Sequence, residues 1–116
     1  MKTDELGRLL VDTFQVDPKN TEVHVFRIRG LKALKLRDTL MQMGRISLEG
    51  HDGQEYVASI GAGFFKSNTA YLALRIEGDR LYVAVNAREG LIDQRTCKGA
   101  INELKEKLGE FIEGEE

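Results

Sequence analysis

The sequence contains little of what marks secreted or metal-binding proteins. Among its 116 residues are one cysteine, one proline, two histidines and no tryptophan. The single cysteine, Cys97, cannot form an intramolecular disulfide or a cysteine-rich zinc site, so we expect a buried thiol. His24 and His51 show none of the close ligand spacings of zinc or calcium sites. We therefore predict neither a metal nor a cofactor.

Long hydrophobic runs are also missing. The longest, residues 60–65, is far shorter than the roughly 20 residues that cross a bilayer. The first eight residues are charged and lack the apolar stretch and cleavage site of a secretory signal. We expect a cytoplasmic protein that has no membrane partner.

The composition is that of a folded protein. Hydrophobic residues make up 41% of the chain and charged residues 31%, whereas disordered chains combine low hydrophobicity with a large net charge. The length lies within the common range for one domain that buries its own core. Residues 1–116 are therefore predicted to form a single domain.

Helical spacing of apolar residues predicts three helices, over residues 4–15, 31–43 and 94–113. The last rests on a stripe that continues through Leu104, Leu108, Phe111 and Ile112. Between the first two helices, residues 21–29 read as a strand rich in β-branched residues, with His24 and Phe26 on one face. Gly44 stands where a cap would end the second helix.

Two hairpins are predicted between residues 44 and 88. In the first, a three-residue loop at 51–53 pairs Leu48 with Tyr56 and Ile46 with Ala58, and its last position suits a left-handed glycine. We prefer this loop to a two-residue turn at Asp52-Gly53, which would oppose Glu49 with Tyr56.

The second hairpin turns at Gly78-Asp79, and its register follows from the side chains on its two faces. One face is wholly aliphatic, with pairs such as Leu74 and Val83. The other mixes small, aromatic and charged side chains: Tyr71, Ala73, Arg75, Tyr82, Ala84 and Asn86.

The order helix, strand, helix, four strands, helix predicts an α+β fold. It contains an antiparallel sheet of about five strands with the helices packed on one face. The aliphatic face of the second hairpin should take that cover. The face of Tyr71 to Asn86 would then be open, and its central Ala73–Ala84 pair would permit the close approach of another surface.

A basic segment is the sharpest charge asymmetry. Residues 23–45 contain six basic residues and one acid, whereas residues 103–116 contain six glutamates and two lysines. Nucleic-acid binding normally needs a domain-wide basic excess, but this chain carries a net charge of −2. We expect a solvated face that pairs with the acidic segment, and no nucleic-acid partner. The candidate patch comprises Arg27, Arg29, Lys32, Lys35 and Arg37.

No catalytic residue is predicted, since His24 is read as a core-edge side chain and His51 as a solvated loop residue. Three function classes follow in rank order. The first is a protein-binding or regulatory module that forms a homodimer through the open sheet face. The second is a small-ligand binder or enzyme that uses the same face. Nucleic-acid binding through residues 27–45 is third. The layout is similar in architecture to small secretion chaperones and other dimerising adaptors, although the helix after the first strand departs from their order.

Overall fold

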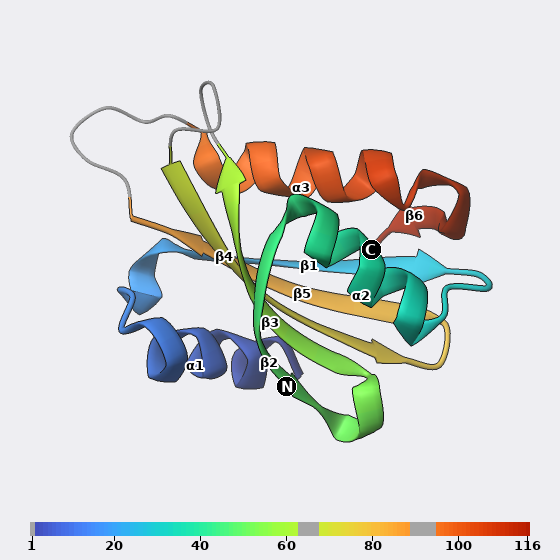
Figure 1. Cartoon of the computed structure of the whole chain (residues 1–116), viewed down its shortest axis with the longest axis horizontal. Coiled ribbons are helices and arrows are strands. Elements are labelled where there is room, and N and C mark those ends of the chain that lie inside the picture. The colour runs from blue at the N-terminus through green and yellow to red at the C-terminus, as the bar shows by residue number, and fades with distance from the viewer. Residues whose placement is uncertain (1, 63–67, 89–94) are drawn as a thin grey trace.

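The sheet lies between two helical layers (Figure 1). The structure, a computed structural model, describes residues 2–62, 68–88 and 95–116. Within these residues the helices are α1 (Lys2–Phe14), α2 (Ala33–Met43) and α3 (Thr96–Lys107). The strands are β1 (Thr21–Ile28), β2 (Gly44–Gly50), β3 (Glu55–Ala62), β4 (Asn68–Glu77), β5 (Arg80–Ala87) and β6 (Ile112–Glu115). Short 3-10 turns occur at Pro18–Asn20, His51–Gly53 and Gly109–Phe111.

The strand order is β2-β3-β4-β5-β1-β6, and all described pairs are antiparallel. The predicted α+β class with an antiparallel sheet is confirmed, with six strands in the described segments instead of about five. None of the helices in these segments is long and apolar enough to span a membrane.

The second hairpin has the predicted register throughout. Leu74 pairs with Val83 on the aliphatic face, and Ala73 pairs with Ala84 on the other. Gly78 opens the turn with a φ of 59°, a left-handed conformation that costs glycine little. Both faces of this hairpin specify the same register, so local sequence is sufficient to fix it.

The first hairpin is predicted correctly only at its base. Ile46 pairs with Ala58 as expected, but Tyr56 faces Glu49 and Leu48 faces Val57. The predicted Leu48–Tyr56 pair is therefore wrong. A β-bulge between Ile46 and Leu48 shifts the register by one residue, so the tip and the base follow different pairings.

Gly44 joins α2 directly to β2. It caps the helix, as predicted, by donating its backbone N–H to the carbonyl of Leu40. A Cβ at this position would collide with the backbone carbonyl oxygen of Ser59 on β3. Glycine therefore allows the chain to enter the sheet without a connecting loop.

The helix predicted over 94–113 ends at Lys107, and the chain continues as the 3-10 turn Gly109–Phe111 and the strand β6. Gly109 weakens the helix just beyond that point, and the edge of β1 offers unpaired backbone groups. Arg29 N–H donates to the Phe111 carbonyl at 2.9 Å, and Glu116 N–H donates to the Val25 carbonyl at 2.8 Å. Strand pairing thus overrides the helical spacing of Phe111 and Ile112.

Two separate cores explain the positions of the helices. Leu72, Leu74 and Val83 form one face of the main core. Opposite them lie side chains that include Leu36 and Leu40 of α2, Leu104 of α3 and Leu108 just after the end of α3. The second core lies on the opposite face, where Leu6 and Leu10 of α1 pack with Val57, Ala73 and Ala84. The prediction that the helices share one face is wrong for α1.

The contact between α1 and the sheet gives a direct test. Ala73 is fully buried beneath the helix, so Ala73→Leu should overpack this contact and lower the free energy of unfolding by about 1–3 kcal/mol. Thr69→Leu is the matched control, because Thr69 lies on the same strand and face but is exposed. Urea denaturation measures both. Equal effects of the two substitutions would show that α1 does not cover Ala73.

Candidate functional site

The sheet face predicted to be open is occupied by α1. Ala73, Ala84 and Asn86 are fully buried, and Arg75 is only 9% exposed. The small side chains do permit close approach, but the surface that approaches is the first helix of the same chain. A partner or ligand cannot reach Ala73 or Ala84 in this conformation. The proposed interface therefore loses the exposed surface on which it depended.

The two tyrosines of this face contact the ends of α1. Tyr71 packs at a tilt against Phe14, with ring centroids 4.4 Å apart. Lys2 Nζ lies 5.3 Å from the centre of the Tyr82 ring, within the range of a cation–π contact. Both tyrosines are half-buried and serve to dock the helix.

Arg75 links α1 to two strands. Its guanidinium donates to Glu55 Oε1 on β3 at 2.8 Å and to Glu5 Oε2 on α1 at 3.0 Å. Burial opposes the charge of Arg75, but the hydrogen bonds to Glu55 and Glu5 outweigh it and raise the arginine pKa. The hydrogen bond from Arg75 lowers the pKa of Glu5 below its ordinary value of 4.5. This is a structural ion-pair network.

Asn86 also has a structural partner set. Its side-chain amide donates to the Asp17 carbonyl at 2.7 Å and to Thr21 Oγ1 at 2.9 Å. These bonds fasten the start of β1 to β5. Of the six residues predicted to form an interface or ligand face, all contact α1 or its neighbouring turn.

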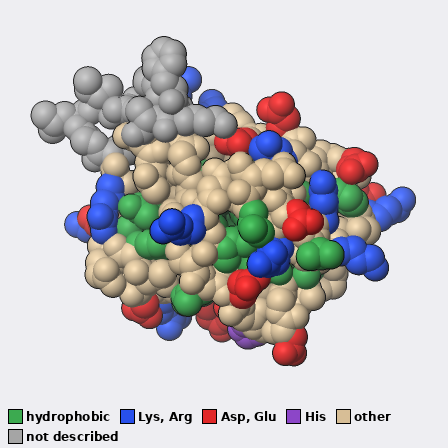
Figure 2. All heavy atoms as spheres, viewed as in Figure 1, with side chains coloured by type: hydrophobic (Ala, Val, Ile, Leu, Met, Phe, Trp, Pro, Cys, Tyr) green, Lys and Arg blue, Asp and Glu red, His purple; other side chains and the backbone are tan. Residues whose placement is uncertain are grey.

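The basic residues of the candidate patch do not form a single positively charged surface. Arg29 Nη2 lies 3.6 Å from Glu113, and Arg37 donates to Glu49 at 2.8 Å, a bond that raises the pKa of Arg37. Arg27, Lys32 and Lys35 are exposed. Figure 2 shows basic and acidic side chains interspersed over the face in view. The expected pairing with the acidic segment is present at Arg29, and nucleic-acid binding stays an untested prediction.

His51 and Cys97 lie in different parts of the fold. The His51 side chain is 58% exposed in the first hairpin loop, where Nε2 lies 3.3 Å from Arg75 Nη2. Cys97 is buried at the start of α3, as expected. Within the described residues no cluster of three or more His, Cys, Asp and Glu side chains has the geometry to hold a metal.

An open cleft of about 850 Å³ lies between the first half of β1 and α3. The turn before β1 and Glu115 of β6 complete it. It is lined by Lys19, Asn20, Thr21, Glu22, His24, Ala87, Arg95, Thr96, Cys97, Lys98, Ile101, Asn102, Lys105 and Glu115.

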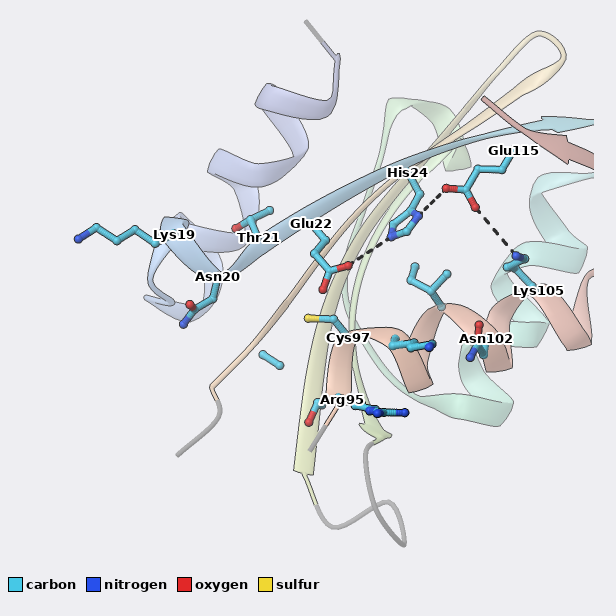
Figure 3. A pocket seen from close by; sticks show the side chains of 14 residues that line it. Lys19, Asn20, Thr21, Glu22, His24, Arg95, Cys97, Asn102, Lys105 and Glu115 are labelled. Carbon is cyan, nitrogen blue, oxygen red and sulfur yellow. Dashed lines mark hydrogen bonds and ion pairs between the residues drawn. The ribbon is translucent and has the colours of Figure 1, made fainter. Parts of the chain in front are cut away.

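His24 is flanked by two carboxylates in this cleft (Figure 3). Its Nδ1 is 2.9 Å from Glu115 Oε2, and its Nε2 is 3.8 Å from Glu22 Oε1. Nε2 is buried and makes no hydrogen bond. Phe26 stacks parallel to the imidazole at a centroid distance of 5.9 Å, which fixes the ring at the edge of the main core. The position matches the core-edge location predicted for this residue.

The cleft has a local excess of positive charge. Four basic residues line it against two glutamates, although the whole chain has a net charge of −2. Both glutamates already face His24, and Glu115 also lies 4.0 Å from Lys105 Nζ. Within the segments that the structure describes, Lys19 and Lys98 make no ion pair. Cations without internal partners are available to attract an anion.

Sequence reasoning identified His24 but not the cleft around it. Its lining residues are spread between positions 19 and 115, so no short segment of sequence contains them. The helix predicted through residue 113 also left no strand where β6 lies. A signal was present in Ile112-Glu-Gly-Glu115, where alternating residues and Gly114 disfavour a helix. That signal was outweighed by the longer helical stripe.

The Glu5–Arg75 contact predicts part of the acid sensitivity of the fold. A carboxyl group whose pKa is lowered by folding contributes stability above its unfolded value of 4.5, and that stability is lost as the pH falls through the folded value. Glu5→Gln should therefore lower the free energy of unfolding more at about pH 6 than at about pH 3.

Urea denaturation at both pH values measures this difference, with Glu110→Gln as an exposed control that has no described ion pair. A Glu5→Gln deficit of the same size at both pH values would contradict the assignment.

Comparison with known proteins gives no information about the cleft or the ion pairs. No protein-family model, curated protein or solved structure matches this chain.

Proposed function

We propose that the protein binds a small polar ligand with an anionic group in the cleft between β1 and α3. The observation that carries the proposal is a cleft of ligand size whose carboxylates are engaged while two of its lysines are unpaired in the described chain. Its volume of about 850 Å³ falls within the roughly 300–1,000 Å³ typical of small-molecule sites.

The lining suits a polar ligand with some apolar surface. Asn20 and Asn102 supply amides that can donate or accept hydrogen bonds, and Thr21 supplies a hydroxyl. Ile101 and Ala87 form an apolar part of the wall. Such a combination of a few polar groups and an apolar wall gives a ligand orientation as well as affinity.

This proposal keeps the small-ligand class foreseen from the sequence but moves it to another part of the fold. The outer sheet face that was to hold the ligand is filled by α1. The first-ranked class, a self-associating protein-binding module, depended on the same open face. The cleft is therefore the better-supported basis for a function.

An NMR titration tests the proposal. Sodium phosphate and sodium succinate are added separately to ¹⁵N-labelled protein, with sodium chloride at matched ionic strength as the reference. We expect shifts at residues 19–24 and 96–102 from at least one of the two anions. Lys98→Ala should weaken that binding roughly two- to fivefold, as an exposed ion pair worth about 0.5–1 kcal/mol predicts.

Lys35→Ala is the matched control, because Lys35 is an exposed lysine of α2 outside the cleft. The proposal fails if neither anion produces more change than chloride, or if Lys35→Ala and Lys98→Ala weaken binding equally.

A further inference from the structure

One carboxylate of the chain already lies among the donors of the cleft. Glu115 Oε2 is 2.9 Å from His24 Nδ1, and Oε1 is 4.0 Å from Lys105 Nζ. The carboxylate belongs to β6, whereas its two partners belong to β1 and α3, and Figure 3 shows it between them. The two oxygens thus have separate partners, one a hydrogen-bond donor and the other a cation.

The strand β6 is also held at the sheet edge by bonds that do not involve the Glu115 side chain. Glu115 is 39% exposed and Lys105 is 46% exposed, and ion pairs this accessible to water contribute little to stability. Other bonds retain β6 at the sheet edge. Glu116 N–H donates to the Val25 carbonyl at 2.8 Å, and Glu116 Oε1 accepts from Arg80 Nε at 2.6 Å.

We propose that Glu115 is an internal occupant of the site and that the ligand is a carboxylate compound that displaces it. The ligand carboxylate takes the hydrogen bond from His24 Nδ1 and the charge of Lys105. This inference rests on the proposed function and specifies its ligand class and its built-in competitor.

The surroundings favour a carboxylate over a phosphate. The two partners of Glu115 match a group with two oxygens and one negative charge. Glu22 Oε1 lies 3.8 Å from the other nitrogen of His24, so a group with a single negative charge is favoured beside this ring over a group that carries two, such as phosphate. The carboxylate could belong to a free small acid or to an acidic side chain of a peptide.

Glu115→Ala tests the inference. Removing the competitor should tighten succinate binding about threefold or more, measured by NMR titration at constant ionic strength. Glu113→Ala is the matched control, because it removes the same charge from the same strand but pairs with Arg29 outside the cleft. We expect less than a twofold change for this control. Glu115→Gln keeps the side-chain shape and should act in the same direction, so it replaces the alanine variant if that variant loses the β6 pairing.

The two sources of the carboxylate are compared by titrating acetyl-Gly-Glu-Gly-amide beside succinate, and tighter binding of one identifies the source. Unchanged or weaker succinate binding in both Glu115 variants would overturn the internal-occupant proposal while the binding site itself stood. Phosphate binding that tightens more than succinate binding would overturn the carboxylate assignment. Absence of cleft shifts with every anion, in the wild type and in the variants, would instead refute the proposed function.

Discussion

The pairing of Ala73 with Ala84 at the centre of the sheet determines how the rest of the molecule is arranged. Two alanines opposite each other leave space for a helix to pack close to the strands, and Leu6 and Leu10 of α1 fill that space. Burial of each leucine contributes roughly 1.5–3 kcal/mol, whereas solvent screens the Arg75–Glu5 ion pair on its exposed Glu5 side. Apolar packing therefore holds α1 in place, and the ion pair specifies its orientation.

Because α1 covers this face, the candidate site lies at the surface near β1 instead. The cores place α1 over β4 and β5, and α2 and α3 on the opposite face. β6 then adds to β1 and brings Glu115 next to His24, beside Lys105 of α3. The cleft is thus a product of tertiary structure, since the turn before β1, β1 itself, α3 and β6 each contribute part of its wall.

Sequence patterns predicted those parts of the fold where short-range signals agree. The second hairpin has a turn signal and two faces that support one register, so Leu74 and Val83 could be paired correctly. The first hairpin could not be fully predicted, because a bulge between Ile46 and Leu48 has no turn residue to mark it. The end of α3 could not be predicted for a different reason. Phe111 and Ile112 continue a helical spacing that is stronger than the local signal at Gly114, and the edge of β1 that pairs with β6 is not visible in the sequence.

The candidate site shows the same limit. The small-residue face correctly predicted a close approach, and the Leu6–Leu10 stripe correctly predicted an amphipathic helix. Sequence periodicity does not reveal that these two surfaces pack together, so the face was interpreted as an interface between molecules. His24 could be placed at the core edge from strand alternation alone. Its neighbours Glu115 and Lys105 could not, because 91 residues separate Glu115 from His24 and their contact depends on β6.

A crystal structure of the protein soaked in succinate would show directly whether the ligand takes the place of Glu115. We expect a carboxylate group of succinate beside His24 Nδ1 and Lys105 Nζ, with the Glu115 side chain rotated towards solvent and β6 still paired to β1. Succinate bound elsewhere on the molecule, or an empty cleft with Glu115 still bonded to His24 at saturating succinate, would contradict it.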